Sequence, residues 1–218
     1  MSIGSYTQQK RDGGMINIQP SAVHVQALQE FAELLPKAAS AAQRRAINKT
    51  LGWLRTHIAR AAGKQERIAI GAIRQRLRAY PVSGSAMRGK LWFGINAIEA
   101  SRIGRARQTG AGVSVAGRRY QGAFFKKVYG SNADIWIRTS SKHFNTTDYP
   151  DAAQGRGRSG FVEENDNRFP LAKAKVSLEQ VRPHFEAWVK RADERLLEIL
   201  TQELNFELQK YLKGTPRV

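Results

Sequence analysis

Basic side chains are the strongest chemical signal in this 218-residue chain. Lys and Arg number 36 against 18 Asp and Glu, so the formal net charge is +18. Such an excess predicts attraction to nucleic acid, to an acidic membrane or to an acidic protein surface. The candidate DNA- or partner-facing residues lie around the expected strands and in a later Gly-rich stretch: Arg102, Arg105, Arg107, Arg118, Arg119, Lys126, Lys127, Arg156 and Arg158.

Aromatic residues are interleaved with these basic ones, namely Trp92, Tyr120, Phe124, Phe125 and Trp136. One interpretation is a surface that meets phosphates with Arg and Lys, without base readout. The other, which we favour, places the aromatic rings in the core and leaves the charges solvated or at an interface. The sequence has no helix-turn-helix, zinc-finger, RNP or basic-zipper pattern.

His143 is the histidine of most interest, because several acidic residues follow it in the sequence. Imidazole and carboxylate groups could together bind a divalent metal. The spacing matches no EF-hand or nuclease pattern, which favours a solvated acidic turn and predicts no metal site. The other histidines have no second His one helical turn away, so no zincin pair is formed. The acidic neighbours are Asp148, Asp151, Glu163, Glu164 and Asp166; the other histidines are His24, His57 and His184.

The glycine-rich segments fail as phosphate-binding loops. Gly110-Ala111-Gly112 lacks the third glycine of a dinucleotide-binding turn, and residues 155–160 lack the Gly-Lys-Ser/Thr that closes a P-loop. Nothing marks a nucleophile for a Ser-His-Asp arrangement. The absence of cysteine excludes disulfides and thiolate chemistry. The sequence therefore predicts a protein that is not an enzyme and has no cofactor.

Helical apolar spacing recurs three times before residue 80. Ser21 is the expected cap of a first, short helix, and Pro36 separates it from the next. Gly63 is expected to break the helical pattern again. The predicted helices cover residues 21–35, 37–62 and 64–79.

Short apolar alternations bounded by Gly, Asn or Asp follow and predict an antiparallel sheet. A long final helix is expected from Ser177 to Gly214. The order predicts an α+β fold with N-terminal helices, a small antiparallel sheet and a long C-terminal helix. The predicted strands lie at 91–95, 113–115, 124–129, 135–139 and 171–176.

The polar segment 1–14 has no apolar stretch of the kind found in secretory signals, and we expect a flexible N-terminal arm there. Residues 15–218 are expected to form a single α+β domain. Within it, residues 140–160 are rich in Ser, Thr, Asn, Gly and Arg and predict a long loop, functional or disordered. No apolar run is long enough to cross a bilayer, so the sequence predicts no membrane partner and synthesis in the cytoplasm.

Several short phrases, taken in their order along the chain, resemble the prophage minor tail protein Z family of tailed phages. The likeness extends from about residue 15 to residue 214. The phrases that carry it are residues 73–77 (IRQRL), 91–94 (LWFG), 112–115 (GVSV), 120–124 (YQGAF), 168–171 (RFPL) and 202–205 (QELN).

This resemblance implies a tail completion protein, added near the head-proximal end of the tail so that the tail can join a filled head. It gives no catalytic residues to carry over. The expected location is the tail or neck of the virion, after synthesis in the bacterial host. The expected partners are further copies in a ring, with six-fold symmetry as the first expectation, together with tail tube, tail terminator or head-tail connector proteins. Non-specific contact with phage DNA is also expected.

Two other functions remain open from the residues alone. The charge and the interleaved aromatic residues fit a sequence-independent nucleic-acid-binding protein of the cytosol. A metal-dependent nuclease would rest only on His143 and the acidic residues after it.

Overall fold

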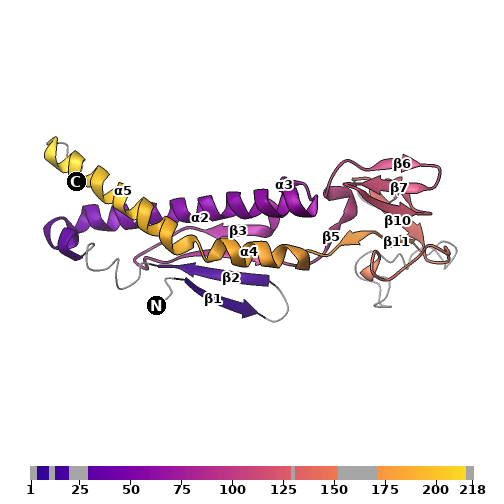
Figure 1. The fold of residues 1–218 in the computed structure, drawn as a ribbon, viewed down its shortest axis with the longest axis horizontal. Coiled ribbons are helices and arrows are strands. Elements are labelled where there is room, and N and C mark those ends of the chain that lie inside the picture. The colour runs from indigo at the N-terminus through magenta and orange to yellow at the C-terminus, as the bar shows by residue number, and fades with distance from the viewer. Residues whose placement is uncertain (1–3, 10–12, 20–28, 129–130, 152–170, 215–218) are drawn as a thin grey trace. The chain divides into compact units, whose positions relative to one another are not determined.

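The computed structural model describes residues 4–9, 13–19, 29–128, 131–151 and 171–214 (Figure 1). Helices and small antiparallel sheets confirm the predicted α+β class. The chain divides into two compact units, where the sequence predicts one domain over 15–218. Unit 1 comprises Met1–Ala61, Arg74–Ile95 and Val181–Val218, and unit 2 comprises Ala62–Ile73 and Asn96–Gln180.

A four-stranded antiparallel sheet in the order β1-β2-β4-β3 forms one layer of unit 1. Alternate residues of its strands point to opposite faces, so one face carries Ile16, Leu77, Leu91 and Phe93, all of them buried. The strands are β1 (Gly4–Gln9), β2 (Gly13–Ile18), β3 (Leu77–Tyr80) and β4 (Gly89–Gly94).

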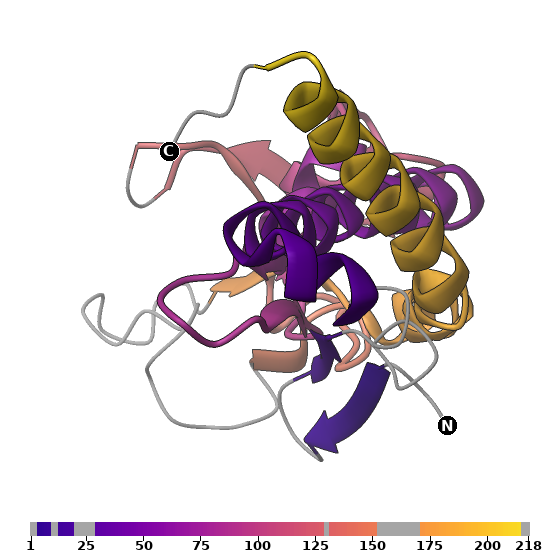
Figure 2. The same ribbon diagram turned by 90° about the vertical axis from the view of Figure 1, so that its left-hand side faces the viewer.

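Helices cover the apolar face of this sheet, as both ribbon views show (Figures 1 and 2). Ile47 and Leu51 of α2 (Pro36–Glu66) lie so close to Gly89 that a Cβ there would meet both side chains at 2.7 Å. Phe185 of α4 (Arg182–Val189) stacks on Phe93 with 5.5 Å between ring centroids. The core of unit 1 therefore lies between one sheet face and these two helices.

The C-terminal segment ends in the predicted long helix but is not one unbroken helix from Ser177 to Gly214. It consists of η3 (Glu179–Val181), α4 and α5 (Ala192–Leu212). Lys190 and Arg191 separate α4 from α5, because the backbone N–H groups there bond to Glu186 and Trp188 and close the first helix. Pro183 lies in the first turn of α4, as expected.

Glu203 and Glu207 of α5 form ion pairs with Arg45 and Lys49 of α2, and we call these four residues the ion cluster. Both glutamates are buried, each about 6% exposed. Arg45 contacts both of them, with 2.5 Å from Nε to Glu203 and 2.5 Å from Nη2 to Glu207, and Lys49 also binds Glu203. The i, i+4 spacing on each helix brings the two pairs face to face.

The described residues of unit 2 form three small antiparallel sheets. Their orders are β6-β7-β8, β9-β10-β11 and β12-β5. The strands are β5 (Ile98–Glu99), β6 (Arg107–Thr109), β7 (Gly112–Val115), β8 (Arg118–Gln121), β9 (Phe124–Lys126), β10 (Asp134–Arg138), β11 (Leu171–Lys173) and β12 (Lys175–Val176), with a 3-10 turn η1 (Ala100–Arg102).

The helix break predicted at Gly63 is wrong, because α2 continues to Glu66. The helix ends where Arg67 adopts a positive φ of 52° and Ile68 donates its N–H to the Gly63 carbonyl at 3.2 Å, as in a Schellman motif. Gly63 instead permits a close approach, since a Cβ there would lie 2.9 Å from Ile70 and 3.0 Å from the Ile68 carbonyl oxygen.

The third predicted helix, over 64–79, is also wrong. Within that range α2 ends at Glu66, α3 (Ile70–Arg76) is a separate short helix, and the next four residues form β3. Leu77 and Ala79 pair with Phe93 and Leu91 of β4, and this tertiary pairing overrides the local helical spacing.

The flexible arm predicted over 1–14 differs from the structure wherever the structure describes it. Gly4–Gln9 pairs with Gly13–Ile18 across a full ladder, and β2 pairs in turn with β4. In the loop predicted over 140–160, the described residues up to Asp151 contain no strand, and residues 152–160 lie outside the described residues. Ser21, the expected cap of the first helix, also lies outside them.

Candidate polyanion interface

The sheet β6-β7-β8 presents basic side chains because its strands alternate strictly. Val113, Val115 and Tyr120 point inward and are buried. Ala116 and Gly117, both with positive φ, make a two-residue turn between β7 and β8, and Val115 pairs with Arg118. This turn fixes the register and thereby decides which arginines face outward.

Arg107, Ser114 and Arg119 stand in one row across the three strands. Arg107 pairs with Ser114, and Ser114 pairs with Arg119, so the three side chains share one face. Both arginines are exposed. With Arg105 they line a surface pocket of about 380 Å³ whose floor includes Val115 and Gly117.

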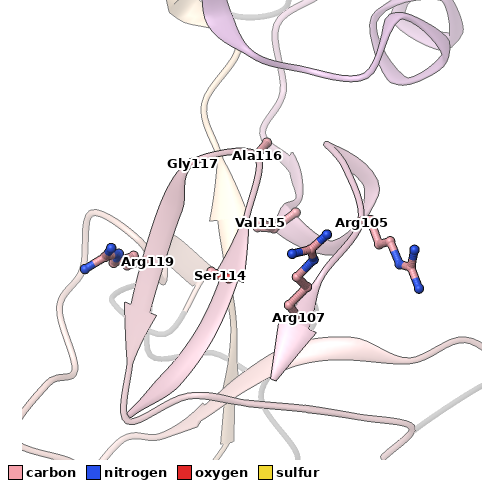
Figure 3. Close-up of a pocket in the computed structure, with 7 residues that line it drawn as sticks. All are labelled: Arg105, Arg107, Ser114, Val115, Ala116, Gly117 and Arg119. Carbon is pink, nitrogen blue, oxygen red and sulfur yellow. The ribbon is translucent and has the colours of Figure 1, made fainter. Parts of the chain in front are cut away.

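The three guanidinium groups around this pocket point in different directions rather than toward one point (Figure 3). Within the described residues, Arg105, Arg107 and Arg119 form no ion pair with any carboxylate. An arrangement of dispersed, unpaired cations suits several phosphates or carboxylates spread over a partner better than one small anion. We call these three residues the arginine row.

The other predicted basic residues lie elsewhere. Arg102 pairs with Glu99 at 3.3 Å. Arg118 is half-buried and donates to the Glu66 carbonyl at 3.3 Å, which ties β8 to the end of α2 within unit 2. Both therefore serve local structure. Arg156 and Arg158 lie outside the described residues.

Lys126 and Lys127 form a second basic group, beside a pocket of about 400 Å³ that Arg138 also lines. Sequence reasoning missed Arg138. Its position at the end of a predicted strand, two residues after Trp136, was the available signal, because i and i+2 side chains share a face.

The interleaved aromatic residues have different environments: Phe124 lines the pocket beside Lys126 and Lys127, and Phe125 is 37% exposed. Tyr120 and Trp136 are 3% and 2% exposed, and Trp92 belongs to unit 1 rather than unit 2. Burial, reinforced by the Asp148 carboxylate, raises the pKa of Tyr120 to about 12, so its hydroxyl stays protonated at neutral pH. For Tyr120 and Trp136, the interpretation as core residues is confirmed.

His143 is exposed, and its two described acidic neighbours have other partners. The Asn145 amide donates to Asp148 at 2.8 Å, and Lys175 binds Asp151. In the described part of the chain, no group of three or more His, Asp or Glu gathers as metal ligands would. Glu163, Glu164 and Asp166 lie outside it.

His57 lies against Trp53 and Trp188, with 4.7 and 4.8 Å between ring centroids. Burial lowers its pKa, and Arg60 and Arg195 lower it further. A neutral imidazole packed against two indoles is a structural residue.

No described helix is both long and apolar enough to span a membrane. No family model matches the chain, and no curated protein or solved structure matches it either.

Proposed function

We propose that this protein is a structural minor tail protein of a bacteriophage, which completes the head-proximal end of the tail for head joining and DNA passage. The observation that carries the proposal is the arginine row. Arg107 and Arg119 lie on a small sheet whose register the Ala116–Gly117 turn fixes, Arg105 precedes the sheet, and none of the three has a carboxylate partner among the described residues. The ordered likeness to the prophage minor tail protein Z family supports the location in the tail.

In this proposal, copies of the chain form a ring, with six-fold symmetry as the working hypothesis, between the tail and the head. The arginine row faces phage DNA or an acidic surface of the tail tube, tail terminator or connector. Contacts with phosphates alone are the chemistry that passage of a whole genome requires, because every sequence must pass equally well.

The test is a charge reversal in infected cells, Arg107→Glu with Arg119→Glu. The control is Lys64→Glu with Lys142→Glu, which changes the same charge at two other exposed cations of unit 2. We expect the first pair to give full-length tails that join heads or deliver DNA poorly, and the control to retain infectivity. Normal virions in a strain that lacks the protein altogether would overturn the proposal.

A sequence-independent nucleic-acid-binding protein of the cytosol is the second candidate, because the same unpaired arginines would meet free DNA. It predicts that the isolated chain binds duplex DNA with an affinity that falls steeply with salt, and that virions assemble normally without it. The tail protein proposal requires an assembly defect, so the two outcomes are distinct.

A further inference from the structure

The four-stranded sheet of unit 1 has a second face that the described helices leave open (Figures 1 and 2). Because residues alternate along a strand, this face carries the side chains between the buried ones. On β3 and β4 they are Arg78, Tyr80, Lys90 and Trp92. Tyr80 is 49% exposed, Arg78 and Lys90 are exposed, and Trp92 is half-buried.

Cations and rings alternate on this face in two dimensions. Arg78 pairs with Trp92, and Tyr80 pairs with Lys90, so each cation stands opposite a ring. Directly opposed residues have Cβ atoms about 5 Å apart, and neighbours along a strand on one face are about 7 Å apart. We call these four residues the outer-face quartet.

No carboxylate belongs to this sheet. The four strands, GSYTQQ, GGMINI, LRAY and GKLWFG, contain no Asp or Glu. In the described residues neither Arg78 nor Lys90 forms an ion pair. Arg88, just before β4, adds another exposed cation. The face thus repels cations and attracts anions.

Trp92 lies along its own strand rather than standing away from it. A Cβ on Gly94 would come within 2.5 Å of Cη2 and 2.9 Å of Cζ3 of the indole, so the ring leans over the glycine two residues on. One side of the ring thus covers the backbone at Gly94, and the residue as a whole remains half-buried rather than fully covered.

We infer that the outer-face quartet binds single-stranded nucleic acid. Its cations are spaced to meet phosphates, and its rings offer stacking surfaces to unpaired bases, which is the combination that single-strand-binding surfaces use. A duplex hides its base faces and gains only the electrostatic part. The inference does not rest on the proposed function, since it concerns different residues, another unit and another ligand.

The first test compares two exposed tyrosines of unit 1. Tyr80→Leu removes the ring and keeps the apolar bulk, and Tyr211→Leu makes the same change on α5, where the tyrosine is 55% exposed. The full-length protein is titrated into a fluorescent oligothymidine, and anisotropy is recorded. We expect Tyr80→Leu to weaken binding about ten-fold, as the loss of one base stack does, and Tyr211→Leu to leave it unchanged.

The second test concerns the cations. Arg78→Gln with Lys90→Gln is compared with Lys37→Gln with Lys190→Gln, an equal charge change at exposed positions of unit 1. The first pair should lower the slope of log affinity against log salt by about 1.4, which corresponds to two phosphates on a single strand. The control pair should keep the slope of the unaltered protein.

Several outcomes would overturn the inference. These are unchanged binding by Tyr80→Leu, equal weakening by Tyr80→Leu and Tyr211→Leu, or equal weakening of single-stranded and duplex DNA by Tyr80→Leu. If oligothymidine binding instead depends on Arg107→Gln with Arg119→Gln and not on the quartet, the arginine row is the binding site and the quartet is not. An intact thermal unfolding transition verifies that each variant folds.

Discussion

The cations of the ion cluster in unit 1 and those of the arginine row in unit 2 differ in their partners. In the ion cluster, Arg45 and Lys49 bind Glu203 and Glu207, whose side chains are only 7% exposed. In the arginine row, exposed guanidinium groups have no carboxylate partner among the described residues. The same residue type therefore serves two purposes, and what separates them is whether a buried carboxylate lies beside it.

The physical reason lies in the desolvation of ions. A buried carboxylate costs several kcal/mol unless cations and hydrogen bonds compensate it, so a cation beside one is committed to the fold. An exposed arginine remains hydrated and is available to a partner. Unit 2 follows the same rule where it buries a carboxylate: Asp134 accepts a hydrogen bond from Ser101 at 2.6 Å and pairs with Lys173 at 2.9 Å.

The largest expected effect follows from removing the cation of the ion cluster. Arg45→Met leaves two buried carboxylates with less compensation, and we expect the free energy of unfolding to fall by about 3 kcal/mol. That is the lower end of the cost of breaking a buried pair, because the Arg45 side chain is 36% exposed. Urea unfolding followed by circular dichroism measures it.

Lys49→Met is the matched control, because its side chain is 62% exposed and contacts only Glu203 of the two carboxylates. It should cost about 1 kcal/mol or less. A combined change, Arg45→Met with Glu203→Leu and Glu207→Leu, should recover most of the lost stability, since no buried charge is left. Equal losses in Arg45→Met and Lys49→Met would contradict the assignment of Arg45 as the central cation.

A smaller loss of folding stability is expected at acidic pH. Burial alone would raise the pKa of Glu203, but hydrogen bonds from Lys49 and Arg45 outweigh it and hold that pKa below its ordinary value of 4.5. The folded state thus binds this proton less readily than the unfolded state. The stabilisation is present above pH 4.5 and is lost as the pH falls through the lowered pKa.

Unfolding free energies measured between pH 7 and pH 3 test this dependence. The difference between the unaltered protein and Glu203→Gln should be constant above pH 5 and should shrink below pH 4.5. Glu198→Gln is the control on the same helix, because the Glu198 side chain is 58% exposed and pairs only with its neighbour Arg195. A pH-independent difference for Glu203→Gln would show that the carboxylate is not held in its charged form.

The sequence predicted those helices and strands whose apolar residues are spaced as one face of that element requires. Helix α2 and strands β4, β7, β9 and β10 were found because one stripe or alternate face of each is apolar. Strand β3 was missed, since Leu77 and Ala79 also fit a helical stripe and only pairing with β4 decides between the two. Strand β1 was missed because its residues are polar or glycine, and its ladder forms through backbone groups. Strand β2 was missed although Ile16 and Ile18 alternate in it and are buried.

The charged sites, too, could be predicted from the sequence only in part. Arg107 and Arg119 could be named from composition alone, but their shared row depends on the turn at Ala116 and Gly117. Arg118 is next in sequence and points to the Glu66 carbonyl instead, which no local pattern indicates. The ion cluster joins residues 158 and 162 positions apart, so neither helix by itself could predict it.

The smallest expected effect concerns the stability of the arginine row itself. Arg105→Gln, Arg107→Gln and Arg119→Gln together should change the free energy of unfolding by less than about 0.5 kcal/mol per substitution, because no desolvated carboxylate depends on these cations among the described residues. Relief of repulsion among three like charges could raise the stability slightly. Thermal and urea unfolding measure it, with Arg45→Met as the destabilised reference. A loss comparable to that of Arg45→Met would mean that the row holds the fold together, and it would remove the physical basis for assigning these arginines to an external partner.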